Sequence, residues 1–211
     1  MVGHILEYHP AITKLKEIID NGELGKISYI YSNRLNLGRF RTEENILWSF
    51  APHDISVILY LLNEMPEKVS AHGGNYLNPN IADVTVTNFD FPSGAKAHIF
   101  VSWLHPYKEQ KLIIIGDKSM MMFDDVHPEN KLLSFNHKIE WIERLPVPRP
   151  EEAQVIEIEK KEPLRAECEH FIESLRTRKS PKTDGHNGLR VLNILERCQE
   201  SMKECGKAKA L

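Results

Sequence analysis

The strongest constraint on the fold is a run of short segments between residues 68 and 135 whose apolar residues alternate with polar ones. In the segment DVTVTNFDF, apolar residues stand between threonines and an asparagine, and a period of two residues predicts β-strands. Pro92-Ser93-Gly94 predicts a hairpin turn. Further strands are expected at 95–104, 111–115, 119–124 and 130–136. Because short turns join them, the strands are expected to form an antiparallel meander.

A second feature is the stretch 45–63, NILWSFAPHDISVILYLLN, which predicts a loop leading into a buried helix. Apolar residues recur there at the spacing of one helical face: Ile55, Ile58, Leu59 and Leu62. The other faces are also largely apolar, so this helix is expected to be buried on more than one side. Pro52 is expected at the first helical position. That would place His53 in the first turn, where the positive end of a helix favours a neutral imidazole.

The rest of the chain predicts smaller elements around these two. They are a short strand at 2–6, a helix at 8–22, a strand at 26–35, an extended surface segment at 139–152, a short strand at 155–159, and helices at 163–178 and 189–205. The helix at 163–178 is expected to turn one set of residues inward: Leu164, Cys168, Phe171, Ile172 and Leu175. Thr183 or Asp184 is the expected cap of the last helix. We therefore predict a single α+β domain over 1–211, an open, mostly antiparallel β-sheet with helices packed on one face.

Composition excludes several classes of protein. The chain is 41% hydrophobic and 27% charged, with a net charge of −3, which gives no reason to expect a nucleic-acid partner. No apolar run reaches the roughly 18 residues of a membrane span, so no membrane partner is expected. Cys168, Cys198 and Cys205 are too few for a disulfide framework and fit inward-facing positions in a cytoplasmic protein.

Sequence motifs for common cofactors and metals are missing from the printed sequence. It contains no GxGxxG, P-loop, HExxH or CxxC. Four histidines lie scattered on expected strands and turns without metal-ligand spacing, and we interpret them as structural or exposed: His98, His105, His127 and His137. We expect no metal site. Asp124-Asp125 is interpreted as a solvated strand end, with acidic ligands as the alternative.

The one convergence of functional side chains lies between the strand at 26–35 and the long helix. Arg34, Asn36, Arg41 and Trp48 precede His53 in this region, with Arg39 in the same basic run. Connections between strands and helices often carry sites in proteins of mixed structure. Arginines bind carboxylates or phosphates, an aromatic ring suits a sugar face, and an imidazole can take the proton of a hydroxyl.

Long stretches of the chain resemble the C-terminal domain of the Gfo/Idh/MocA oxidoreductases, the glucose–fructose oxidoreductase and inositol dehydrogenase family. They are GHILEYHPAITKLKEIIDNGELGKI, LWSFAPHDISVILYLL, DFPSGAKAHIFVSWLHPYKEQKLIIIGDKSMMMFDD and PLRAECEHFIESLRTRKSPKTDGHNGLRVLNILERC. The resemblance covers essentially the whole chain. It implies an NAD(P)-dependent dehydrogenase that acts on a hydroxyl of a sugar, sugar nucleotide or cyclitol.

The resemblance also implies roles for particular positions. His53 matches a catalytic histidine of the family, and Arg34, Asn36, Arg41, Trp48 and Ser49 are the expected substrate-binding residues. The family commonly has an acid four residues before that histidine, whereas this chain has Ser49, which puts an acid-assisted proton relay in doubt. The family's Rossmann domain, with its glycine-rich loop and catalytic lysine, is absent from the sequence. NAD or NADP is therefore expected in the intact enzyme and not on this chain.

Three hypotheses remain open from the sequence. The first is the substrate-binding and oligomerisation half of an oxidoreductase, inactive alone, which forms a homodimer or homotetramer through the free sheet face. The second is a cofactor-independent binding or scaffolding module that dimerises through its sheet. The third is a complementation pair whose Rossmann domain is a separate chain.

Overall fold

The structure, a computed structural model of the chain, describes residues 1–38, 40–136 and 138–211. Arg39 and His137, both named above, lie outside the described residues. The helices are η1 (Ile5–Tyr8), α1 (Pro10–Asp20), α2 (Ile46–Leu62), α3 (Pro163–Thr177) and α4 (Gly185–Lys203). The strands are β1 (Ile27–Leu35), β2 (Lys68–Gly74), β3 (Val84–Asp90), β4 (Lys96–Ser102), β5 (Glu109–Gly116), β6 (Met120–Asp124), β7 (Leu132–Phe135), β8 (Lys138–Ile142), β9 (Leu145–Arg149), β10 (Gln154–Val155) and β11 (Lys209–Ala210).

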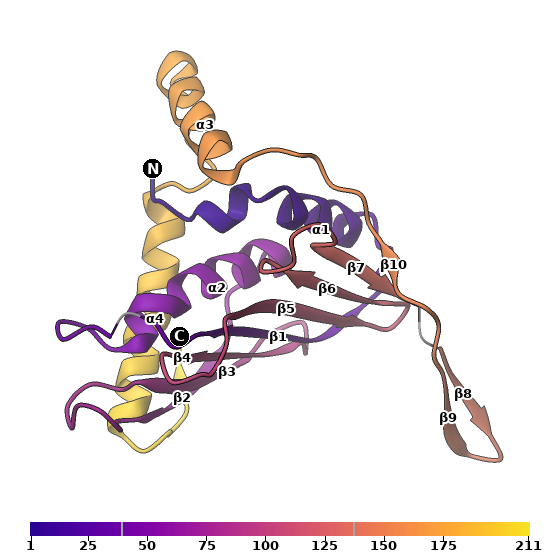
Figure 1. Cartoon of the computed structure of the whole chain (residues 1–211), viewed down its shortest axis with the longest axis horizontal. Coiled ribbons are helices and arrows are strands. Elements are labelled where there is room, and N and C mark those ends of the chain that lie inside the picture. Colours follow the sequence, from indigo (N-terminus) through magenta and orange to yellow (C-terminus); the bar gives the residue numbers. More distant parts are fainter. Residues whose placement is uncertain (39, 137) are drawn as a thin grey trace.

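Nine of these strands form one open sheet in the order β10-β7-β6-β5-β1-β4-β3-β2-β11 (Figure 1). The pairing of β1 with β4 is parallel, and the other pairings in this sheet are antiparallel. The predicted α+β class is confirmed, because an open, mostly antiparallel sheet carries its helices on one face.

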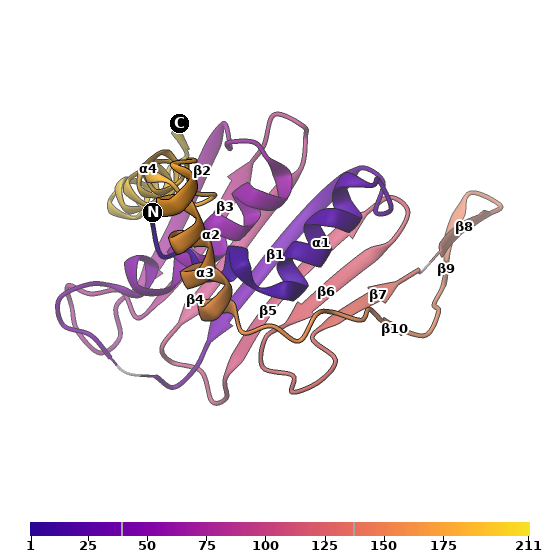
Figure 2. The ribbon, with the colours of Figure 1, turned by 90° about the horizontal axis from the view of Figure 1, so that it is seen from above.

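The hydrophobic core lies between the sheet and the helices α1, α2 and α4, which cover the same face of the sheet (Figure 2). Helix α2 is central to it. Ile55 and Val57 lie on nearly opposite sides of this helix, and both are buried. The expectation that the helix is buried on more than one side is therefore confirmed. Strand β1 turns Ile30 and Arg34 toward the helices, which brings its end close to α2.

The start of α2 differs from the prediction. The helix begins at Ile46, and Asn45 caps it by accepting a hydrogen bond from the Trp48 N–H at 3.3 Å. Pro52 therefore lies inside the helix, where it removes one backbone donor. Burial of Ile46 and the Asn45 cap favour the earlier start. His53 consequently lies beyond the first turn, and the helix N-terminus does not act on it.

Two further predictions are wrong: the strand at 2–6 and the inward-facing side of the helix at 163–178. Residues 2–6 form no strand, because the 3₁₀ helix η1 occupies Ile5–Tyr8. Helix α3 projects away from the sheet (Figure 1), so the residues expected to face inward are exposed: Leu164, Cys168, Phe171, Ile172 and Leu175. Cys205 is also exposed, whereas Cys198 is buried as predicted. Periodicity identifies an apolar face, but it does not identify what covers that face.

Three smaller expectations can be compared with the structure. The segment 139–152 contains most of a hairpin, β8 and β9, in place of a purely extended segment. Residues 155–159 contribute only the end of the two-residue strand β10. Asp184 caps α4 by accepting from the Asn187 N–H at 2.9 Å, as predicted. Within the described ranges, the helices are too short or too polar to cross a membrane.

Candidate functional site

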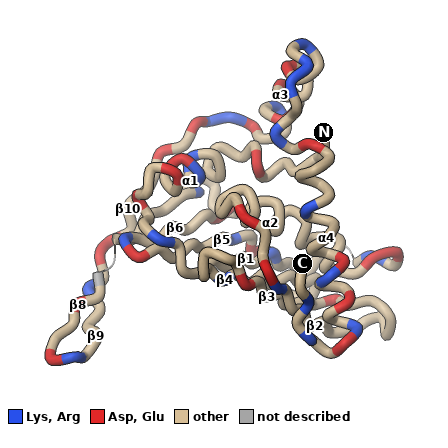
Figure 3. The backbone as a smooth tube through the Cα atoms, turned by 180° about the vertical axis from the view of Figure 1, so that it is seen from behind, with Lys and Arg blue, Asp and Glu red and all other residues tan. Residues whose placement is uncertain are grey.

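A cavity of about 1080 Å³ opens beside the end of β1 and the middle of α2. Arg34 and His53 line it, and His9 lines it from the start of α1. The turn after β6 and the segment joining β10 to α3 complete the wall. Figure 3 shows acidic and basic positions along that joining segment. The cavity therefore brings together two of the predicted site residues, Arg34 and His53.

His53 has the surroundings expected of a proton acceptor. Its ring is half-buried, and its Nδ1 is fully buried without a hydrogen-bond partner among the described residues. Burial and the nearby charge of Arg34 lower the pKa of His53, although Asp54 opposes the shift. The neutral imidazole that the sequence predicted is therefore favoured, but burial is the main cause and the helix N-terminus is not.

Arg34 is held by a buried ion pair. Its Nε donates to Asp54 Oδ2 at 2.8 Å, and its Nη2 donates to Asp54 Oδ1 at 3.3 Å. Ser32 also donates to Asp54 Oδ1, at 2.6 Å. The Nε–Nη2 edge of the guanidinium is thus committed to Asp54. Arg34 fixes α2 against β1 at the cavity, and its contact with a substrate stays a prediction.

Sequence reasoning missed a second polar group in the same cavity. His9 Nε2 lies 3.5 Å from Asp125 Oδ1, and Lys131 Nζ lies 3.1 Å from the same oxygen. The Asp124-Asp125 pair was noticed, but Asp125 is not the solvated strand end that we expected, since its side chain is only 24% exposed. His9 and Asp125 are far apart in sequence, and no local spacing could have paired them. The one available signal was His9 directly before Pro10, at the start of a predicted helix.

The other predicted substrate residues are not among those lining this cavity. Trp48 lines a separate cavity of about 560 Å³, and its Nε1 donates to Gln199 at 3.1 Å. Arg41 is exposed and pairs with Glu44 at 3.2 Å. The side-chain oxygen of Asn36 is buried without a partner among the described residues, and the Ser49 N–H continues the helix by donating to the Asn45 carbonyl. Roles for Asn36, Arg41, Trp48 and Ser49 in substrate binding remain predictions.

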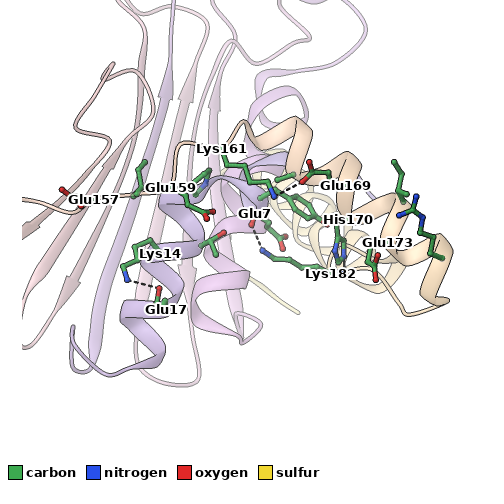
Figure 4. Close-up of a pocket in the computed structure, with 17 residues that line it drawn as sticks. Glu7, Lys14, Glu17, Glu157, Glu159, Lys161, Glu169, His170, Glu173 and Lys182 are labelled. Atoms are coloured by element: carbon green, nitrogen blue, oxygen red, sulfur yellow. Dashed lines mark hydrogen bonds and ion pairs between the residues drawn. The ribbon is translucent and has the colours of Figure 1, made fainter.

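A second groove, of about 930 Å³, lies between α1 and α3 (Figure 4). Most of its cations are already satisfied. Lys182 donates to the Glu7 carbonyl and lies 3.8 Å from the centre of the Tyr60 ring, and burial lowers the pKa of Lys182 to about 8. Lys14 and Lys161 each pair with a nearby glutamate. Because its lysines are paired within the chain, this groove is less suited to bind an anionic ligand. The His53 cavity is therefore the better candidate site.

The starts of the four α-helices are partly occupied by the chain's own side chains. The pyrophosphate of a dinucleotide commonly binds free backbone N–H groups at a helix N-terminus. Side chains of the chain itself already cap the four α-helices: His9, Asn45, Glu162 and Asp184. Two of these caps are carboxylates, which repel phosphate. Within the described part of the chain, no cluster of histidine, cysteine or acidic side chains could hold a metal ion.

Comparison with known proteins matches the chain to one family. The family model described as the GFO/IDH/MocA C-terminal domain matches residues 12–122. An uncharacterized oxidoreductase of Bacillus subtilis (strain 168) is 24% identical over 213 residues, covering 95% of this chain and 60% of that protein.

Solved structures agree with this match at the level of the fold. A UDP-N-acetylglucosamine 3-dehydrogenase from Acidithiobacillus ferrooxidans superposes with a TM-score of 0.78 at 21% identity, covering 96% of this chain and 62% of that one. An oxidoreductase from Agrobacterium radiobacter, in complex with NAD⁺, L-tartaric acid and magnesium, gives a TM-score of 0.75 at 16% identity, covering 100% and 64%. The chain thus spans less than two thirds of the length of each of these proteins.

Proposed function

The chain belongs to the GFO/IDH/MocA C-terminal domain family, and from that premise we propose that it is the substrate-binding and oligomerisation part of an NAD(P)-dependent oxidoreductase. Its substrate is a hydroxyl-bearing sugar, sugar nucleotide or cyclitol. The observation that carries the proposal is His53, an imidazole with a lowered pKa that lines a cavity large enough for such a molecule.

The relatives support this assignment in two ways. One neighbour is a dehydrogenase of a sugar nucleotide, and another was solved with NAD⁺. Both are longer than this chain, which leaves room in them for a further domain. We propose that residues 1–211 are one domain and that a separate dinucleotide-binding domain completes the enzyme.

In this proposal the chain supplies proton chemistry and positioning. Neutral His53 accepts the proton of the substrate hydroxyl as the carbon–oxygen bond gains double-bond character. Arg34, held by Asp54, lies beside the imidazole and helps to keep it neutral. NAD(P) supplies the hydride chemistry in the intact enzyme, and this chain holds no part of it.

Fluorescence titration of NADH tests whether the cofactor is held by a domain other than this chain. We expect the chain alone to leave NADH emission unchanged through the micromolar range, because its helix N-termini are already capped. Bovine serum albumin at equal concentration controls for non-specific effects. Saturable tight binding of NADH by the chain would contradict the proposal that the cofactor is held elsewhere.

The sheet face without helices supports the oligomerisation part of the proposal. Paired residues form a row across five strands on this face: His98, Tyr31, Ile113, Met122 and Leu133. All are half-buried in the single chain. A neighbouring row carries Tyr29, Ile115 and Met120. Monomeric proteins rarely leave so continuous an apolar surface open, and an apolar, aromatic and Met-rich patch is typical of a subunit interface.

We expect Ile113→Lys to separate the subunits. The substitution places an unpaired charge at the centre of the row, and burying it would weaken association by roughly 100-fold or more. Asn193→Lys is the matched control, because Asn193 is an exposed residue on α4, which covers the opposite face of the sheet. Sedimentation equilibrium measures the result. A wild-type chain that stays monomeric at high micromolar concentration would refute this interface.

A further inference from the structure

Asp125 and Lys131 lie in the same cavity as His53, yet the proposed reaction does not use them. We propose that they form a second substrate-binding point, a donor–acceptor pair that holds two neighbouring hydroxyl groups of a polyhydroxylated substrate, with His9 positioning the carboxylate. This inference rests on the proposed function, because it names the part of the substrate that the cavity recognises.

His9 lies beside Asp125 in a fixed orientation. Its Nδ1 accepts the Ala11 N–H at 3.1 Å as the cap of α1. That bond leaves the ring proton on Nε2, the atom that lies 3.5 Å from Asp125 Oδ1. The ring of His9 is also packed against Phe123, with 4.9 Å between ring centres. A buried imidazole fixed on both sides restricts the rotation of the carboxylate beside it.

The hydrogen-bonding capacity of Asp125 is not used up. An ionised carboxylate has about four acceptor sites. Oδ1 faces His9 and Lys131. In the side-chain orientation of Gln110 that satisfies its neighbours, Oδ2 accepts the Gln110 amide at 3.3 Å. About one acceptor site therefore remains on Oδ2 for a hydroxyl proton.

Lys131 supplies the complementary donor. Its ammonium carries three N–H groups, and two of them are directed at the backbone carbonyl and the Oδ1 of Asp125. None of the described residues accepts from the third N–H, which is left for a hydroxyl oxygen. A donor and an acceptor fixed side by side match two adjacent hydroxyl groups, each of which can both donate and accept.

Asp125 and Lys131 are also connected, through hydrogen bonds, to the residues beside His53. Gln110 accepts from Arg34 Nη1 at 3.1 Å in the same orientation, and Arg34 is bound to Asp54 on α2. The backbone N–H of Asp125 donates to the Gln110 carbonyl at 2.9 Å. Polar groups therefore connect α2 to the turn after β6 without a break. This connection fixes the distance between the proton acceptor and the second binding point, which is what a specificity determinant requires.

Substitution of Asp125 tests the proposal with myo-inositol and glucose as probes. We expect Asp125→Asn in the full chain to weaken binding of the preferred probe by roughly 10- to 100-fold, as loss of a charged hydrogen-bond acceptor implies. Asp124→Asn is the matched control, because Asp124 accepts the backbone N–H groups of Val126 and His127 and is not among the residues lining this cavity. It should change affinity by less than about threefold. Affinity is read from chemical-shift titrations by NMR, and thermal unfolding verifies that each variant folds.

His9→Asn separates positioning from folding. Asparagine keeps the helix cap but removes the nitrogen that faces Asp125, so an intermediate loss of affinity is expected with little change in thermal stability. In the intact enzyme, Asp125→Asn should raise KM more than it lowers kcat.

The possible outcomes separate this inference from the proposed function. If the probes shift the His53 resonances and Asp125→Asn binds as well as wild type, the second binding point is wrong and the proposed function stands. If neither probe binds the wild-type chain, the cavity does not take a free sugar or cyclitol, and the second binding point falls together with that part of the proposed function.

Discussion

Arg34→Met is expected to lower the free energy of unfolding by about 3–5 kcal/mol, because it leaves a buried carboxylate without its cation. Asp54 is 4% exposed, and Arg34 Nε lies 2.8 Å from it. Methionine keeps most of the side-chain volume, so the loss reports the charge and not a cavity. Urea unfolding followed by circular dichroism measures the effect.

A matched pair on the surface isolates the contribution of burial. Arg149 Nε also lies 2.8 Å from a carboxylate, that of Glu140, but both side chains are more than half exposed. Arg149→Met should therefore cost less than about 1 kcal/mol. If the double substitution Arg34→Met, Asp54→Leu recovers most of the stability, the penalty is that of an unpaired charge. Equal losses for Arg34→Met and Arg149→Met would contradict a structural role for the buried pair.

The sheet could be predicted from sequence because its signals are local. Alternation in DVTVTNFDF and the turn at Pro92-Ser93-Gly94 each involve residues a few positions apart. Strand β1 was predicted as a strand as well, but its parallel pairing with β4 was not. Partner choice between distant strands depends on the whole chain and leaves no local pattern.

The candidate site could be predicted only where its residues come from elements that follow one another in the sequence. Arg34 ends a strand and His53 follows on the next helix, so their meeting in one cavity could be anticipated. Arg41 and Trp48 lie between them in sequence, but Trp48 donates to Gln199 and Arg41 pairs with Glu44 at an exposed position. His9 and Asp125 could not be anticipated, because the sheet brings them together from 116 positions apart in the chain.

Helix α3 illustrates a different limit. Its spacing identified an apolar face, and the helix itself forms where predicted. The face nonetheless lies exposed in the structure, with Phe171 48% accessible. Amphipathic spacing follows from the helix alone, whereas burial depends on whatever polypeptide lies opposite.

His53 carries the largest expected effect on activity. Glutamine is similar in size and polarity but cannot accept a proton, so His53→Gln removes general-base catalysis. Loss of a positioned acid–base group lowers rates by about 10²- to 10⁴-fold. Substrate affinity should change far less, since the binding groups that we propose, Asp125 and Lys131, are untouched. His186→Gln, at an exposed histidine in the first turn of α4, is the matched control.

The most direct test of the proposed role is therefore kcat for His53→Gln in the intact enzyme that we propose, followed as NAD(P)H formation from the preferred polyol. We predict a fall of at least about 10²-fold in kcat, with KM within a few-fold of wild type and the His186→Gln control unchanged. A His53→Gln enzyme that turns over at the wild-type rate would contradict the assignment of the imidazole as proton acceptor.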